Sequence, residues 1–320
     1  MQRDTRLVDN GDGWQLELTR FSPAGGVASG ARPVLMVPGY AMNSFILSFH
    51  PTGVSMVEYL VNDGLEVWTV DLRGQGGSRR VSGGGRFGLR ELSLVDVPAA
   101  IRHVLQNTTT GADRLDLVGC SLGASMVYAY LAHHAQDHFA DRVIAIGGPL
   151  RWDAVHPLMA AAFRSGRIAG AVPIVGTRKL ARVALPLLKR MPALLSIYMN
   201  ADEVDLTQAD QLVQTVDDPV PWINRQIARW IRHKDLVVDG VNVTEGLGAV
   251  DTPVMVVLAN KDGIVPVPAA MSVADAIGRD QVTVLEVGDP VRWAAHADLF
   301  IGEGAQERVF APMSAWLREG

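Results

Sequence analysis

Short apolar runs alternate with longer helical patterns along most of this 320-residue chain. The runs expected to form strands lie at 14–21, 33–37, 65–70, 114–118, 142–146, 253–258 and 281–287. The helical patterns between them lie at 53–63, 92–105, 121–134, 269–277 and 305–318. Strands that alternate with helices form a parallel sheet covered on both faces, and such buried strands are apolar throughout. We therefore expect an α/β fold with a mostly parallel sheet.

The alternation is interrupted between residues 150 and 250. Residues 151–200 carry eight basic side chains and one acid, so their net charge is +7. The chain as a whole has a net charge of −5. Apolar residues recur there at helical spacing, as at Leu180, Val183, Ala184, Leu187 and Met191. We predict an all-helical cap at residues 150–250, inserted over the strand ends of a catalytic domain formed by residues 1–149 and 251–320.

Composition narrows the class of protein. Hydrophobic residues make up 48% of the chain and charged residues 20%, which is typical of a globular protein. The net charge of −5 argues against a nucleic-acid-binding protein, since such proteins rely on a positive surface. We see no apolar signal sequence and no apolar run near the roughly 20 residues that span a membrane. No internal disulfide is possible, because Cys120 is the single cysteine. We expect a cytoplasmic protein that needs no cofactor or metal.

The sharpest motif is Gly-Cys-Ser-Leu-Gly at residues 119–123. It follows a predicted strand and opens a predicted helix, the context in which G-x-S-x-G presents an exposed serine on a strained turn. The two glycines fit such a turn, because a β-carbon would clash where strand and helix crowd together. Ser121 is therefore the candidate nucleophile. Taken alone, the motif is also compatible with a tight turn that has no chemistry.

A serine nucleophile needs a base, and the base needs a carboxylate that orients it. His296 follows the last predicted strand, whereas the other seven histidines lie on helices, in connecting segments or in the insertion. Asp262 lies in the turn after the strand at 253–258. Carboxyl ends of parallel strands meet at one edge of the sheet, so both side chains are placed to meet Ser121. Asp298 is the rival acid, but it lies two residues from His296 and is better placed to support the loop.

Charge that develops on a substrate carbonyl needs hydrogen-bond donors already in place. The backbone N–H groups of Leu122, just after the nucleophile, and of Tyr40, after the first parallel strand, are the candidate oxyanion hole. The glycine-rich stretch at 71–78 lacks the G-x-G-x-x-G spacing of a dinucleotide site. We expect Asp71 and Arg73 to tie this loop down by hydrogen bonds, with no catalytic role.

Together these residues resemble the α/β-hydrolase superfamily. The motifs are P-G-Y at 38–40, D-L-R-G-Q-G-G-S at 71–78, G-C-S-L-G at 119–123, N-K-D-G-I-V-P at 260–266 and H-A-D-L-F at 296–300. They occur in the order serine, acid, histidine. The resemblance implies an α/β-hydrolase fold with an eight-stranded, mostly parallel sheet, and a triad of Ser121, His296 and Asp262.

The resemblance covers residues 14–149 and 251–320. Residues 196–236 look more loosely like the cap of hydrolases related to polyhydroxyalkanoate synthases. Those synthases place a cysteine at the centre of the nucleophile motif, whereas Ser121 is central here and Cys120 is one residue out of register. The resemblance also disfavours haloalkane dehalogenases and epoxide hydrolases, which use an aspartate at this position.

The favoured function is hydrolysis of a carboxylic ester with an apolar acyl or alcohol part, by an acyl-enzyme mechanism at Ser121. The alternatives are an acyltransferase, a thioesterase or a carbon–carbon bond hydrolase on the same triad, and a non-catalytic protein that kept the pocket. The expected partner is a small ester. A second hypothesis is that basic residues of 179–191 meet an anionic lipid surface or acyl carrier.

Overall fold

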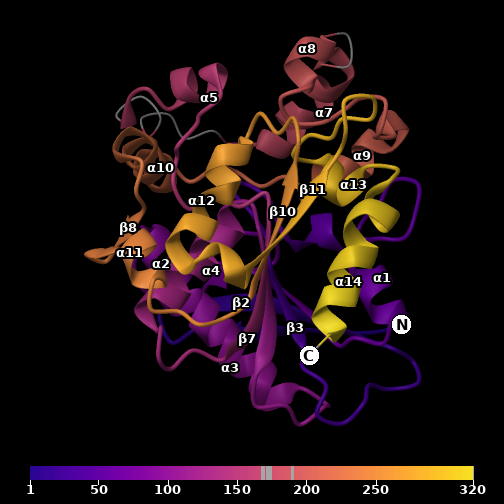
Figure 1. The fold of residues 1–320 in the computed structure, drawn as a ribbon, viewed down its shortest axis with the longest axis vertical. Helices are drawn as coiled ribbons and strands as arrows, with labels where there is room; N and C mark the ends of the chain where they lie inside the picture. The colour runs from indigo at the N-terminus through magenta and orange to yellow at the C-terminus, as the bar shows by residue number, and fades with distance from the viewer. Residues whose placement is uncertain (167–169, 171–174, 189–190, 320) are drawn as a thin grey trace.

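The computed structural model describes residues 1–166, 170, 175–188 and 191–319, and its centre is a nine-stranded sheet (Figure 1). The strands are β1 (Gln2–Asp9), β2 (Trp14–Ser22), β3 (Val34–Val37), β4 (Val67–Asp71), β5 (Arg79–Arg80), β6 (Leu115–Cys120), β7 (Ala140–Ile146), β10 (Val254–Ala259) and β11 (Val282–Val287). Their order is β1-β2-β4-β3-β6-β7-β10-β11, with β5 paired to β2. β2 is antiparallel to β1 and β4, and the pairs from β4 to β11 are parallel. The predicted mostly parallel sheet is confirmed.

Helices cover both faces of this sheet, and each face has its own hydrophobic core. On one face lie α3 (Val97–Asn107), α4 (Leu122–His133) and α12 (Val267–Ile277), and on the other lie α1 (Met56–Asn62) and α14 (Ala311–Arg318). In β3 the side chains of Leu35 and Val37 enter the first core, and those of Val34 and Met36 enter the second. Both sets are fully buried, which is why the strands are apolar at every position.

Several shorter helices complete this part of the chain. They are α2 (Leu89–Glu91), α13 (Asp298–Ile301), the π-helical turns Leu92–Asp96 and Gln306–Phe310, and the 3-10 turns Ser44–Leu47 and Arg279–Gln281. Helix α1 begins with a capping box, in which the Ser55 hydroxyl accepts the Glu58 N–H at 3.3 Å while the Glu58 carboxylate accepts the Ser55 N–H at 3.0 Å.

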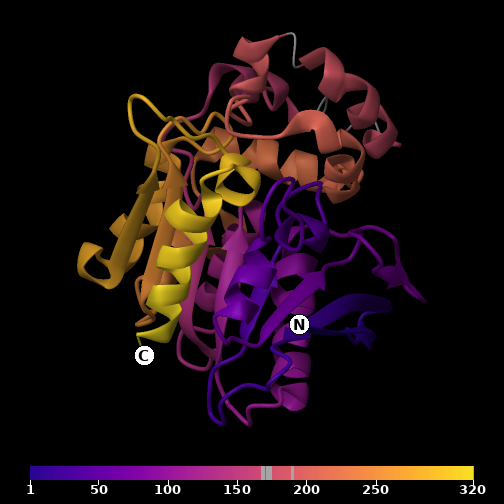
Figure 2. The same cartoon turned by 90° about the vertical axis from the view of Figure 1, so that its right-hand side faces the viewer.

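The segment between β7 and β10 lies at one end of the sheet (Figure 2). Its helices are α5 (Pro157–Ala162), α7 (Thr177–Leu188), α8 (Pro192–Leu195), α9 (Ala209–Leu212), α10 (Pro221–His233) and α11 (Val243–Leu247), with 3-10 turns at Leu206–Gln208 and Val213–Thr215. It is hydrogen-bonded to loops that follow parallel strands, as in Gly263 N–H to Ile197 O at 3.1 Å and Ala297 N–H to Tyr198 O at 2.8 Å. The segment therefore covers the carboxyl ends of the strands.

The expectation that residues 150–250 are all helical is wrong. Strands β8 (Val237–Val238) and β9 (Val241–Asn242) form a small antiparallel hairpin. Asp239 and Gly240 make its turn, with φ angles of 46° and 82°. Two positive φ angles in a two-residue loop are the signature of a type I′ turn, for which Asp-Gly is a favoured sequence. This Asp-Gly turn signal is visible in the sequence, where it lies between Val238 and Val241.

The sheet also has strands that the apolar runs did not predict. β1 is largely exposed, because it is an edge strand paired only to β2, so its sequence is polar. β5 has two exposed residues. The path from β1 to β11 has eight strands, as predicted, and β5 adds a ninth.

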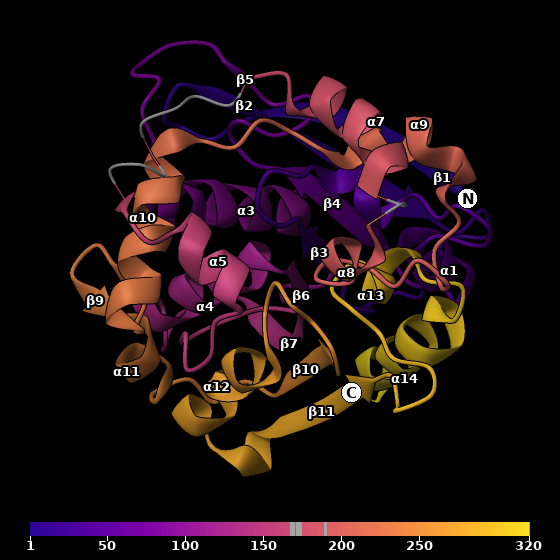
Figure 3. The same ribbon diagram turned by 90° about the horizontal axis from the view of Figure 1, so that it is seen from above.

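The apolar stripe predicted along residues 179–191 is not packed on the protein where the structure describes it. Leu180 is 61% exposed and Val183 is 65% exposed on α7, which lies on the outer side of the cap (Figure 3). The predicted positions Lys189 and Arg190, and the Leu187 side chain, lie outside the described residues. Among the described helices, we find none that is both long and apolar enough to cross a membrane.

Candidate active site

Ser121 lies on the turn between β6 and α4, at the carboxyl end of a central strand. Its φ and ψ angles are 53° and −123°, a conformation that L residues rarely adopt. The Ser121 N–H donates to Ile146 O of the neighbouring strand at 2.7 Å, which helps to hold this strained backbone. The serine is thus presented on a sharp turn, as the G-x-S-x-G motif predicts.

The flanking glycines permit this turn for steric reasons. A β-carbon on Gly119 would lie 2.4 Å from Ala124 Cα, and one on Gly123 would lie 2.3 Å from Val37 O. Both contacts involve backbone atoms, so neither can be relieved by a side-chain movement. Cys120, by contrast, is fully buried in the core on the α1 and α14 face, where burial raises the pKa of its thiol far above the ordinary value. A buried neutral thiol is a poor nucleophile.

His296 and Asp262 are brought into direct contact. The distance from His296 Nδ1 to Asp262 Oδ2 is 2.6 Å, and both side chains are buried. The other carboxylate oxygen, Asp262 Oδ1, accepts the N–H groups of Ile264 and Val265 at 2.8 Å each. The carboxylate is therefore fixed in orientation by its own turn. Because an ionised carboxylate only accepts, it selects the tautomer with the proton on Nδ1 and leaves Nε2 as the acceptor.

Two glycines after β7 lie beside both the serine and the histidine. A β-carbon on Gly147 would lie 2.9 Å from His296 Cε1, and one on Gly148 would lie 3.4 Å from Ser121 O. The structure therefore brings all three predicted residues to one edge of the sheet. Within the described residues, no hydrogen bond joins the Ser121 hydroxyl to His296. Nucleophile–base bonds of this kind are often long without substrate and tighten when it binds.

The two predicted oxyanion donors line one small cavity. Tyr40 and Leu122 both contribute to it, and its volume is about 20 Å³, which is room for about one water molecule. In the described part of the chain, neither of their backbone N–H groups has a hydrogen-bond acceptor. A β-carbon on Gly39 would lie 2.9 Å from Ser121 Cβ, so the Tyr40 peptide passes directly beside the serine. Two unused donors therefore lie next to the candidate nucleophile.

Gln75 holds the peptide that carries the Tyr40 N–H. Its Nε2 donates to Gly39 O at 2.9 Å, and its Oε1 accepts the Leu72 N–H at 2.9 Å. In a trans peptide the C=O and N–H point in opposite directions, so a donor on Gly39 O aims the Tyr40 N–H the other way. No sequence motif pointed to Gln75, because a buried glutamine has no motif of its own, and the loop that carries it was expected to have no role at the site.

The loop itself is held by buried charges. Asp71 accepts the Ser44 N–H at 2.7 Å, and Arg73 pairs with Asp96 at 2.7 Å, so the predicted hydrogen bonds of Asp71 and Arg73 are confirmed. Burial raises the pKa of Asp71 to about 6. A β-carbon on Gly76 would overlap the Asp71 carboxylate, which explains why this turn carries glycine.

Asp298, the rival acid, has a different role. Its carboxylate accepts the Ala295 N–H at 2.7 Å and the Asn200 N–H at 3.0 Å. It therefore fastens the His296 loop to the cap and does not orient the imidazole. Burial raises the pKa of Asp298 to about 7, and the backbone N–H bonds lower it in part.

The cap reaches the same site through α10. The Tyr40 hydroxyl is hydrogen-bonded to Asn224 Oδ1, and burial keeps the pKa of that phenol well above its ordinary value. Val220 and Ile223 line the cavity beside Tyr40. Within the described ranges, no group of three or more His, Cys, Asp and Glu side chains is arranged to hold a metal ion.

A strained serine turn, a buried His–Asp pair and unused backbone donors, all at one edge of a mostly parallel sheet, are the arrangement expected of a serine hydrolase of the α/β-hydrolase class. The chain belongs to the family described as Serine aminopeptidase, S33, whose sequence profile matches residues 52–287. The matched range contains Ser121 and Asp262 and ends before His296. Among curated proteins, none matches this chain in sequence.

Solved structures with similar folds are hydrolases and related enzymes. An esterase from Exiguobacterium antarcticum superposes with a TM-score of 0.66 at 15% identity, covering 99% of this chain and 100% of its own. An esterase from Rhodococcus sp. gives a TM-score of 0.63 at 17% identity, covering 100% and 99%. A bromoperoxidase from Bacillus anthracis gives 0.64 at 14% identity, covering 99% and 100%. At these identities the similarity establishes the α/β-hydrolase fold.

Proposed function

We propose that this hydrolase cleaves carboxylic esters through Ser121, His296 and Asp262. The observation that carries the proposal is the strained Ser121 turn next to a 2.6 Å His296–Asp262 contact. His296 Nε2 removes the proton of Ser121, whose oxygen attacks the ester carbonyl. The N–H groups of Tyr40 and Leu122 stabilise the oxyanion. His296 then protonates the departing alcohol and activates the water that releases the acid.

The lining of the cavity favours an apolar substrate. Beside the candidate oxyanion donors it presents the side chains of Phe87, Leu92, Met126, Val220 and Ile223. At about 20 Å³ the cavity is too small for an acyl chain, so its walls have to open when an ester binds.

The same cavity favours ester substrates over the peptides with a free amino terminus that an aminopeptidase cleaves. A free carboxylate is the natural partner of a substrate ammonium group. Two carboxylates line the cavity, and both are already engaged. Asp217 pairs with Arg178 at 3.1 Å and accepts the Gly76 N–H at 2.8 Å, and Asp218 accepts the Thr177 N–H at 2.7 Å.

The test is a panel of p-nitrophenyl esters of increasing acyl length, beside the p-nitroanilides of free amino acids. We expect turnover of the esters, loss of that turnover in Ser121→Ala, and no release of p-nitroaniline. Efficient cleavage of the anilides would show that the aminopeptidase description of the family applies to this chain. Unchanged ester turnover in Ser121→Ala would refute the proposal.

A further inference from the structure

A cluster of arginines lies on one side of the cap helix α10. Arg225, Arg229 and Arg232 recur at helical spacing and, with His233, line a surface hollow of about 800 Å³. Arg225 donates to Gly170 O at 3.1 Å and Arg232 donates to Arg164 O at 3.3 Å. In the described part of the chain, none of the three has a carboxylate partner. Their charges are therefore uncompensated.

The arginines of α7 provide the contrast. Arg178 pairs with Asp217 at 3.1 Å, and Arg182 pairs with Asp210 at 2.6 Å. Both cap helices are basic, but among their described arginines those of α7 are paired with carboxylates and those of α10 are not.

A fourth arginine extends the cluster toward the active site. Arg86 lies over the Trp222 ring, 3.7 Å from its centroid, in a second hollow of about 260 Å³ that also contains Arg225. No Asp or Glu lines either hollow among the described residues.

The second hollow adjoins the candidate active site. Phe87 and Val220 line both this hollow and the small cavity beside Tyr40 and Leu122. Along α10, Asn224 contacts Tyr40, and Arg232 lies eight residues further, which is about 12 Å at 1.5 Å per residue. The arginines thus begin beside the candidate active site and extend about 12 Å away from it along α10.

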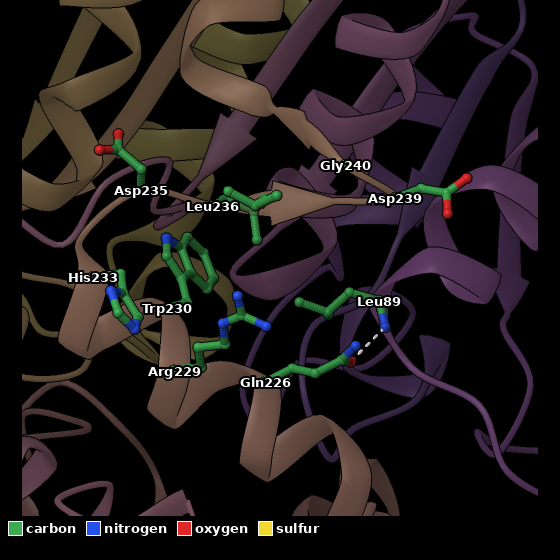
Figure 4. Close-up of a pocket in the computed structure, with 10 residues that line it drawn as sticks. Leu89, Gln226, Arg229, Trp230, His233, Asp235, Leu236, Asp239 and Gly240 are labelled. Carbon is green, nitrogen blue, oxygen red and sulfur yellow. Dashed lines mark hydrogen bonds between the residues drawn. The ribbon is translucent and has the colours of Figure 1, made fainter.

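Arg229 also lines a third hollow, of about 500 Å³, between α10 and the β8–β9 hairpin. Arg229 extends into it toward Leu236 (Figure 4). The two acids there are already engaged: Asp239 pairs with Arg90 at 3.2 Å, and Asp235 accepts the Thr244 hydroxyl at 3.1 Å. Among the described residues, neither acid forms an ion pair with Arg229.

We propose that Arg86, Arg225, Arg229 and Arg232, the arginine groove, bind the phosphates of a substrate's leaving group while its acyl carbonyl lies at Ser121. Guanidinium groups bind phosphate oxygens bidentately, and four of them in a row suit a group with two or more phosphates. The substrate class is an acyl thioester or ester of a phosphorylated small molecule with a flexible linker of about 10 Å or more. This proposal rests on the proposed function and specifies its substrate.

The reaction balances with water as the only co-reactant. Ser121 Oγ forms a bond to the acyl carbon, the carbon–sulfur bond breaks, and the sulfur takes the proton held by His296. Water then cleaves the acyl-enzyme, and the products are a carboxylic acid and the phosphorylated thiol. The arginine groove holds the phosphates and takes no part in proton transfer.

The kinetic test compares octanoyl coenzyme A with the octanoyl thioester of N-acetylcysteamine, which has the same reacting group and no phosphate. We expect wild-type kcat/KM for the coenzyme A thioester to be higher by about tenfold or more at low salt, and the advantage to shrink at about 0.3 M NaCl. In Arg225→Gln/Arg229→Gln/Arg232→Gln, this ratio should fall at least about tenfold, mainly through KM. Arg3→Gln/Arg79→Gln/Arg279→Gln removes the same charge elsewhere and should keep the wild-type ratio. Equal kcat/KM for the two substrates would overturn the inference.

A binding measurement separates this inference from the proposed function. Coenzyme A, which has no ester to cleave, is titrated into the Ser121→Ala protein by calorimetry. We expect saturable binding that weakens at least about tenfold in the triple groove variant and not in the control variant. Binding that is absent, or unchanged in the groove variant, would overturn the inference whether or not Ser121 is the nucleophile.

Discussion

The sheet edge and the cap are built in different ways. At the edge, Ser121, Asp262 and His296 are 9%, 6% and 2% exposed. Ser121 is held by Ile146 O of the neighbouring strand, Asp262 by the backbone of its own turn, and His296 by Asp262. The outer cap helix α7 leaves Leu180 and Val183 more than half exposed. The comparison indicates that the candidate catalytic side chains are held firmly at the sheet edge, whereas the outer cap helix is loosely packed.

A few contacts join the two regions. Tyr40 meets Asn224 of α10, and Asp298 accepts the Asn200 N–H. Each contact attaches the cap to a loop that carries a proposed functional group. If the comparison is right, substitutions at the edge should lower kcat, and those on the outer cap should leave both kcat and stability almost unchanged.

A large loss of activity is expected from substitution of Asp262. Asp262→Asn should lower kcat/KM on the order of 10³- to 10⁴-fold, because the amide no longer selects the tautomer that accepts the serine proton. Asp298→Asn is the matched control, since it makes the same change two residues from His296, and it should cost less than about tenfold. Kinetics with a p-nitrophenyl ester measure both. A larger loss in Asp298→Asn would identify Asp298 as the acid.

A smaller effect is expected at Gln75. In Gln75→Glu, a carboxylate faces Gly39 O and can no longer donate, so the Tyr40 N–H loses its fixed direction. We expect kcat to fall about 10- to 100-fold with KM nearly constant, less than for loss of an oxyanion donor itself. Gln136→Glu is the control. Gln136 is exposed and also donates to a backbone carbonyl, Ala249 O, which belongs to none of the candidate site loops. A change confined to KM would contradict the positioning role.

The pH dependence of stability tests the buried carboxyl of Asp298. Its folded pKa of about 7 is raised by burial above the ordinary aspartate value, so the folded state keeps the proton over a range where the unfolded state has lost it. The free energy of unfolding should therefore fall as pH rises from about 4 to about 7, by at most about 1.4 kcal/mol per pH unit. Asp298→Asn removes this contribution, so its stability relative to wild type should improve from pH 5 to pH 8. Urea unfolding measures the difference, and a constant difference would show that Asp298 does not titrate in this range.

The smallest effect is expected on α7. Leu180→Gln and Val183→Gln should change the free energy of unfolding by no more than about 0.5 kcal/mol, because both side chains are already in solvent. Ile227→Ala on α10 is the buried counterpart and should cost about 2–5 kcal/mol. The hypothesis of an anionic lipid partner concerns the basic residues instead, and Arg178→Gln/Lys179→Gln/Arg182→Gln tests it. Binding of wild type to anionic vesicles that is lost in this variant would support the hypothesis, and no binding of wild type at low salt would contradict it.

The sheet and its edge were largely predictable from the sequence, because local patterns determine them. Buried parallel strands are apolar at every position, and a serine between two glycines after a strand has few structural alternatives. The Asp262 and His296 positions followed from strand ends alone. In each case the structural constraint lies within a few residues of the side chain concerned.

The role of Gln75 and the exposure of α7 depend on tertiary contacts that no local sequence pattern encodes. Gln75 contacts Gly39, a residue 36 positions away in sequence, through an ordinary amide. The exposure of Leu180 depends on what packs beside α7, and helical periodicity alone cannot give that. The β8–β9 hairpin is different, since Asp239-Gly240 was a readable turn signal that the helical pattern around it obscured.

The most direct test of the central claim is the site of covalent labelling by a fluorophosphonate. The probe is added to wild type, Cys120→Ala and Ser121→Ala, and the adduct is located by peptide mass spectrometry. We predict one adduct on Ser121 in wild type and in Cys120→Ala, and none in Ser121→Ala. An adduct on any other residue, or full ester turnover after Ser121 is removed, would contradict the account.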